Sequence, residues 1–244
     1  MDRGYFNQMA LKTDSEESVS WEGDYREPVV EDFLKDAKPK PIQPLLIQHD
    51  NGALRATIFW SIVIVLSSLF NWAQGDRWAF MVNLPTVAEN GEFYRLWTSL
   101  FIHSDFGHLA SNLWLFAIFG YLLRSFWGLL VFPFLSFIAV GGLASVATIF
   151  WYQNSTFLLG ASGMIYGMIG LWLVTYLRYE LRYRFRTRLF RAIGFILVML
   201  FPSTITENIS YSAHFFGFFI GGLVGVILIL LYGTSKETPR IDLS

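Results

Sequence analysis

Six apolar stretches, most of them about as long as a membrane-crossing helix, decide what this chain can fold into. An α-helix needs about 20 apolar residues to cross the hydrocarbon core of a bilayer. Only 15% of the residues are charged, against about 25% in a typical soluble domain. The sequence therefore predicts an all-α, polytopic membrane protein with six transmembrane helices. The stretches are Ala53–Trp72, Gly107–Arg124, Trp127–Tyr152, Gly160–Tyr179, Leu189–Phe201 and Tyr211–Tyr232.

Polar segments flank the apolar region and divide the chain into three parts. Residues 1–52 contain eleven acidic and six basic side chains, which is typical of a weakly ordered cytoplasmic tail. We expect residues 53–232 to form the six-helix transmembrane domain and residues 233–244 to form a short cytoplasmic tail. Residues 73–106, between the first two stretches, are rich in aromatic side chains and are predicted to lie partly in the membrane interface.

The basic residues predict how the helices are oriented. Lysine and arginine collect on the cytoplasmic side of a bilayer. With the N-terminus in the cytoplasm, ten basic residues flank the cytoplasmic ends of the stretches, and two, Arg77 and Arg95, fall on the other side. We therefore expect both termini in the cytoplasm. The fourth and sixth stretches then begin at the outer face.

The composition also excludes several kinds of site. The chain has no cysteine, which rules out disulfides, cysteine catalysis and thiolate ligands for a metal. Its formal net charge is −1, and no basic stripe alternates with aromatic residues, so no nucleic-acid partner is expected. No metal, nucleotide or other cofactor is indicated.

A serine and a histidine stand near the outer ends of the fourth and sixth stretches. They are Ser162 and His214, and polar side chains inside a bilayer are rare and usually functional. A Ser–His pair is the minimum for nucleophilic acyl transfer, because the imidazole accepts the hydroxyl proton. A lone membrane serine more often bonds to its own helix backbone. The histidine at matching depth is what favours a catalytic role.

Small residues predict how these two helices meet. Glycine stripes let membrane helices pack backbone against backbone, and Ser162 shares a helical face with Tyr166. We expect such packing to bring the Ser162 hydroxyl within hydrogen-bonding distance of His214. Ordinary helix packing explains the glycines equally well, and the two interpretations are compatible. The stripes contain Gly163 and Gly167 in the fourth stretch, and Gly217 and Gly221 in the sixth.

The second stretch begins with a further polar cluster. His108 and Asn112 are one helical turn apart, and both can donate hydrogen bonds to a developing oxyanion, as acyl transfer requires. His103, just before them, is interpreted as a structural histidine of the connection. A zinc site is the rival interpretation, but it lacks a third histidine or a carboxylate other than Asp105.

Taken together, these motifs resemble the rhomboid family of intramembrane serine proteases. The resemblance covers about residues 90–232 and rests on three runs: His103 to Asn112, Gly160 to Gly163, and Ala213 to Gly221. In the first external loop, Tyr94-Arg95 stands where the family usually has Trp-Arg. The resemblance implies that Ser162 is the nucleophile and His214 the general base. It also implies an oxyanion hole made by His108, Asn112 and the backbone N–H of Ser162, with Tyr166 holding the His214 ring.

The same resemblance implies an intramembrane serine endopeptidase without a cofactor. Such an enzyme hydrolyses a peptide bond in or next to the transmembrane segment of a membrane-protein substrate, so its partners are transmembrane proteins and the lipid bilayer. The oligomeric state is left open. The alternatives are a catalytically silent rhomboid-like binder of transmembrane helices and, ranked lower, a small transporter. The six-span layout favours a bacterial inner membrane over a eukaryotic secretory membrane.

Overall fold

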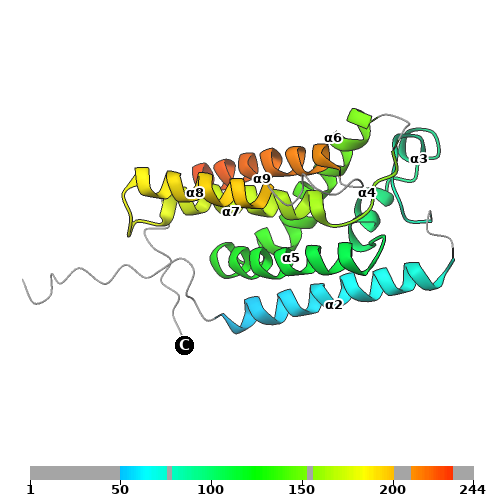
Figure 1. Ribbon diagram of the computed structural model, residues 1–244, viewed down its shortest axis with the longest axis horizontal. Coiled ribbons are helices and arrows are strands. Elements are labelled where there is room, and N and C mark those ends of the chain that lie inside the picture. Colours follow the sequence, from blue (N-terminus) through cyan, green and yellow to red (C-terminus); the bar gives the residue numbers. More distant parts are fainter. Residues whose placement is uncertain (1–49, 76–78, 153–155, 201–209, 233–244) are drawn as a thin grey trace, which may run out of the picture. The chain divides into compact units, whose positions relative to one another are not determined.

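The computed structural model describes residues 50–75, 79–152, 156–200 and 210–232 (Figure 1). Apart from 50–52, both predicted tails lie outside these residues. Within them, the regular elements are helices, and one isolated β-bridge joins Val82 to Leu158. The predicted all-α, polytopic membrane fold is confirmed. Four described segments are long and apolar enough to cross a membrane: Asn51–Ala73, Phe106–Trp127, Leu130–Tyr152 and Tyr211–Tyr232.

The count of six spans stays a prediction. The helices of the fourth and fifth stretches, α7 (Ser162–Tyr179) and α8 (Phe185–Leu200), have 18 and 16 residues. Among the described residues, neither helix is both long enough and apolar enough to be counted as a membrane span. Polar and small residues lower the hydropathy of α7, and α8 is short and rich in arginine at its start, so a count based on apolar length passes over both.

Helices α2 (Asn51–Ala73) and α5 (Phe106–Trp127) lie side by side (Figure 1). Near one end, the Asp50 backbone N–H donates to the Tyr121 hydroxyl at 3.2 Å. Near the other, the Ser68 hydroxyl donates to the carbonyl of Phe101 at 3.1 Å. Numbers rise along α2 as they fall toward the start of α5, so the two helices are antiparallel.

The predicted boundary between the second and third stretches is wrong. We expected the second stretch to end at Arg124 and the third to begin at Trp127, but α5 continues through Trp127. Gly128 ends this helix with a φ of 80°, a positive value that glycine adopts readily because it has no Cβ atom. The third segment then begins as the π-helix η2 (Leu130–Gly141) and continues as α6 (Gly142–Tyr152).

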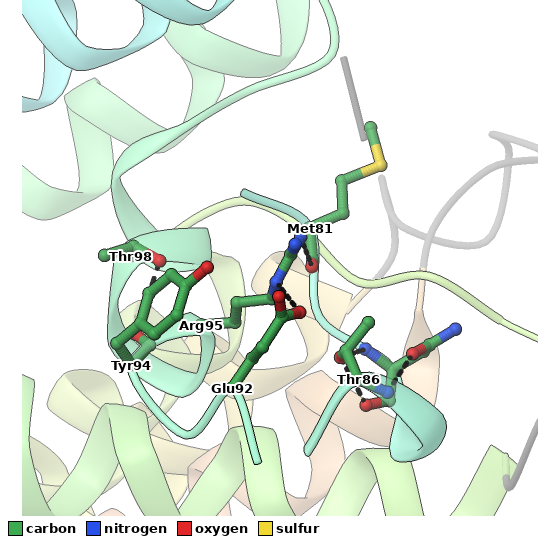
Figure 2. A network of polar contacts seen from close by, with 7 residues as sticks. Met81, Thr86, Glu92, Tyr94, Arg95 and Thr98 are labelled. Carbon is green, nitrogen blue, oxygen red and sulfur yellow. Dashed lines mark hydrogen bonds and ion pairs between the residues drawn. The ribbon is translucent and has the colours of Figure 1, made fainter. Parts of the chain in front are cut away.

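The aromatic connection between α2 and α5 is folded into short helices: α3 (Leu84–Ala88), α4 (Arg95–Thr98) and η1 (Ser99–Phe101). Figure 2 shows the polar contacts that hold it. Arg95 donates to the carbonyl of Met81 at 3.0 Å and pairs with Glu92 at 2.6 Å. Asn83 caps α3 through a reciprocal bond with Thr86. These contacts give η1 a fixed place before α5.

Helix α7 is the centre of the described fold. Two thirds of its length is buried against α5, η2, α6, α8 and α9 (Tyr211–Tyr232). The apolar core around it includes Met164, Ile165, Met168, Phe116 and Leu123. A helix enclosed by other helices can carry a polar residue at its end without exposing that residue to lipid.

The predicted starts of the fourth and fifth stretches also need correction. Helix α7 begins at Ser162 rather than Gly160, because Gly160 has a φ of 100° that does not fit a right-handed helix. Helix α8 begins at Phe185 rather than Leu189, since its arginine-rich first turn does not read as apolar. The end predicted at Phe201 lies outside the described residues.

Candidate active site

Helices α7 and α9 meet backbone against backbone along their glycines (Figure 1). A Cβ atom added to Gly221 would overlap the carbonyl group of Gly167. Residue numbers rise together along the contact, so the helices are parallel and their first turns lie at one level. Ser162 and His214 belong to these first turns. The facing pairs are Gly163 with Gly217, Gly167 with Gly221, and Leu171 with Gly225.

The ring of His214 stacks on the ring of Tyr166. The ring centroids are 4.0 Å apart and the planes differ by 7°. Both residues are buried. Tyr166 lies one helical turn after Ser162 on α7, so the stack fixes the imidazole against the helix that carries the serine.

Ser162 and His214 share a level, but no hydrogen bond joins their side chains among the described contacts. The Nδ1 atom of His214 is buried and has no partner within the described part of the chain. The hydrogen bond that the sequence predicts between Ser162 and His214 stays a prediction. Catalytic hydrogen bonds are often long before a substrate binds and shorten in its presence.

Two side chains of α5, His108 and Asn112, are the predicted oxyanion donors. A Cβ atom on Gly160 would lie 2.9 Å from Nε2 of His108, so this ring packs against the loop that leads into Ser162. Asn112 is buried, and its Nδ2 amide has no partner among the described residues. An unpaired buried donor is costly, which makes a ligand oxygen its natural partner.

The start of α5 orients His108. Asp105 caps the helix by accepting the backbone N–H of His108 at 2.9 Å. The Ser104 hydroxyl lies 2.7 Å from the Asp105 carboxylate and 3.1 Å from Nδ1 of His108. The hydrogen bond from Ser104, followed by that from the His108 backbone, lowers the pKa of Asp105 below its usual value. With Nδ1 directed at Ser104, the Nε2 edge of the imidazole faces Gly160.

Two residues near the site were not singled out from the sequence. Ser68 and Trp72 of α2 contact His103, which precedes α5 and is 0% exposed. Their spacing of one helical turn was a possible signal, because a buried serine and an indole on one face of an apolar helix need hydrogen-bond partners.

Within the described residues, no group of three or more histidine, aspartate or glutamate side chains is placed to hold a metal ion.

Comparison with known proteins identifies the family of the chain. The family model of the Rhomboid domain matches residues 90–231, which is more than half of the 244 residues and includes His108, Asn112, Ser162, Tyr166 and His214. No curated protein matches the chain. The Rhomboid domain is a polytopic helical membrane fold, and the family consists generally of serine intramembrane proteases, with some inactive members. With its helical fold and its extensive domain match, this chain belongs to the rhomboid family.

Proposed function

We propose that the protein is an intramembrane serine endopeptidase with a Ser162–His214 dyad. It hydrolyses a peptide bond in or next to the transmembrane segment of a membrane-protein substrate. The observation that carries the proposal is the stack of His214 on Tyr166, 4.0 Å between centroids, one turn from Ser162. It holds a buried imidazole in the first turn of α9, beside the first turn of α7 that carries the Ser162 hydroxyl.

In the first half of the reaction, His214 accepts the proton of the Ser162 hydroxyl as Oγ attacks the scissile carbonyl carbon. The carbonyl oxygen becomes an oxyanion, which accepts hydrogen bonds from the Ser162 backbone N–H and the Asn112 amide. It also accepts from Nε2–H of His108 once the Ser104 hydroxyl donates to Nδ1 of that ring instead of to Asp105. The unpartnered Nδ2 of Asn112 supports its place in this set. The intermediate then collapses, the peptide C–N bond breaks, and protonated His214 gives its proton to the leaving amine.

In the second half, water hydrolyses the acyl-enzyme. His214 takes a proton from the water molecule as the oxygen attacks the ester carbon, and the proton returns to Ser162 Oγ as the ester bond breaks. The chain's own side chains supply every proton transfer. Tyr166 keeps the imidazole plane fixed while His214 changes its protonation state.

The location follows from the charge pattern and is part of the proposal. Both termini lie in the cytoplasm, and the protein is a multi-pass protein of a bacterial inner membrane. The arginines between α7 and α8 support this orientation. The first turns of α7 and α9 then face the outer side, from which water reaches Ser162. Substrates are transmembrane proteins embedded in the same bilayer.

The decisive experiment is labelling with a serine-reactive fluorophosphonate. The wild-type protein should be labelled and should cleave a reporter transmembrane substrate in proteoliposomes, whereas Ser162→Ala should do neither. Ser136→Ala is the matched control, because Ser136 is a buried serine that donates to Val131 and lies outside the site. Labelling that survives in Ser162→Ala would show that the nucleophile is another residue. A wild-type protein that is neither labelled nor active would favour a catalytically silent binder of transmembrane helices.

A further inference from the structure

His103 is a fully buried histidine that the proposed mechanism leaves unused. It is 0% exposed and lies between η1 and α5. Its Nδ1 atom is 3.1 Å from the Ser68 hydroxyl of α2, and its Nε2 atom accepts the backbone N–H of Ala161 at 3.4 Å. Trp72, one turn after Ser68, donates its indole N–H to the His103 carbonyl at 2.7 Å. His103 therefore links α2 to the residue just before Ser162.

One arrangement of protons satisfies all these contacts. The Ser68 hydroxyl donates to the carbonyl of Phe101 at 3.1 Å, so its oxygen accepts from the Nδ1–H of His103. Nε2 is then unprotonated and faces the N–H of Ala161. The chain of hydrogen bonds runs in one direction, from Ala161 through His103 and Ser68 to Phe101, and it requires a neutral imidazole.

The neutral form is strongly favoured. Burial and, to a smaller extent, the charge of His108 lower the pKa of His103 to about 3, while Asp105 acts in the opposite direction. Protonation at Nε2 would place an N–H against the N–H of Ala161. The ring therefore acts as a permanent acceptor at neutral pH.

The two backbone amides just before Ser162 are both held by hydrogen bonds. The N–H of Gly160 donates to the carbonyl of Ser99 at 2.8 Å, and the N–H of Ala161 donates to His103. Both amides before the nucleophile are thus held by the segment that leads into α5. The N–H of Ser162, in the first turn of α7, has no acceptor within its helix and remains available to the substrate.

We propose that His103 is a positioning residue that fixes the orientation of Ser162 through the N–H of Ala161. Ser68 and Trp72 tie this orientation to α2. The inference rests on the proposed function, since the nucleophile that His103 places is the one assigned there. His103 itself touches neither the substrate nor the reacting atoms. A nucleophile displaced by about 1 Å loses turnover on the order of 10²-fold, so His103 affects rate more than substrate binding.

The test compares two amide substitutions of similar polarity. In His103→Gln, the longer side chain brings its oxygen to the position of Nε2 and can still accept the N–H of Ala161. In His103→Asn, the shorter side chain reaches Ser68 only. We expect kcat for a reporter transmembrane substrate to fall about 10²-fold in His103→Asn with KM changed less than about twofold, and to recover at least about tenfold in His103→Gln. Equal kcat values in the two variants would overturn the proposal.

A second pair of variants covers the case in which His103→Asn does not fold. Ser68→Ala removes the acceptor for Nδ1, whereas Ser67→Ala removes a hydroxyl one residue earlier on α2 that makes no hydrogen bond to His103 among the described contacts. We expect Ser68→Ala to lower kcat about tenfold relative to Ser67→Ala. Its thermal unfolding midpoint should also be lower, because the Phe101 carbonyl and the Nδ1–H of His103 lose a buried partner. Indistinguishable kcat values would contradict the proposed link from α2.

Hydrogen exchange separates a failure of this inference from a failure of the proposed function. The amide of Ala161 should exchange faster in His103→Asn and Ser68→Ala than in wild type and Ser67→Ala, whether or not the protein is active. A wild-type protein without Ser162-dependent labelling would reject the proposed function. Ser162-dependent labelling with unchanged Ala161 exchange in all four proteins would reject the positioning role alone.

Discussion

The imidazole of His214 lies flat against the phenol ring of Tyr166, with 4.0 Å between centroids and 7° between planes. Two rings in this arrangement exclude water from one face of the imidazole and restrict its rotation. No carboxylate is needed for that restriction, because the contact area itself sets the plane of the ring. The histidine is thus oriented by packing on the same helix that carries Ser162.

Removing the ring at position 166 should therefore lower turnover. Tyr166→Ala leaves His214 free to rotate, and we expect kcat for a reporter substrate to fall on the order of 10²-fold. Tyr166→Phe keeps the aromatic plane and should retain most of the wild-type rate. The measurement is kcat in proteoliposomes for both variants. A large loss in Tyr166→Phe would indicate that the hydroxyl, not the ring, carries the effect.

The oxyanion donors should contribute to the rate of chemistry. Removal of one donor from an oxyanion hole costs roughly 10²–10³-fold in kcat, so Asn112→Ala and His108→Ala should each lower kcat by up to this factor. The stability of Asn112→Ala should change little, since the Nδ2 atom has no described partner to lose. Steady-state rates for the single and double variants are the test. An unchanged rate in the double variant would remove both residues from the oxyanion hole.

The contact between α7 and α9 should be sensitive to a single methyl group. In Gly221→Ala the new Cβ would overlap the Gly167 carbonyl, so the helices must separate at a cost of about 1–3 kcal/mol. Gly194→Ala in α8 is the matched control, because no atom lies within 4 Å of its added Cβ. There, the better helix propensity of alanine should stabilise by up to about 1 kcal/mol. Thermal unfolding in one detergent should show opposite signs for the two variants.

Stability should decrease in mild acid because of His103. Its pKa is about 3 in the folded protein and 6.5 when exposed, so the unfolded chain binds a proton between these values while the folded chain does not. The free energy of unfolding therefore falls as the pH drops below about 6.5 and stops falling near pH 3. Each pKa unit is worth about 1.4 kcal/mol, which makes this an effect of a few kcal/mol at most.

The check is the midpoint of unfolding measured from pH 7 to pH 4. His103→Gln has no titrating group at this position and should show a flatter pH profile than the wild type. Parallel profiles for the two proteins would mean that another group causes the acid sensitivity.

That Ser162 and His214 lie at the same depth could be predicted from the sequence, because the order of the helices constrains their directions. Two helices separated by one other span run in the same direction, and residues near their starts then share a depth. The spacing of the glycines predicted which faces of the two helices are in contact. Both arguments use periodicity within single helices, which a sequence displays directly. The same kind of argument placed His108 and Asn112 on one face of α5.

Other features depend on contacts that no local pattern contains. The link from Ser68 through His103 to Ala161 joins three segments far apart in the chain. The sequence around each of these residues contains no pattern that indicates the link. The helix boundary at Gly128 was missed because apolar residues continue on both sides of the glycine. Helix α8 begins earlier than expected, because the arginines near its start lower the hydropathy by which the stretch was recognised.

The glycine contact between α7 and α9 has a consequence for temperature and lipid composition. Where main chains touch directly, there are no side-chain rotamers to populate, and the distance between the helix axes is set by atoms of fixed geometry. Heating or a change of bilayer should therefore move α7 and α9 together as one body. The activity of such a pair responds to its surroundings through substrate entry and water access, while the distance between serine and histidine is conserved until the pair comes apart altogether.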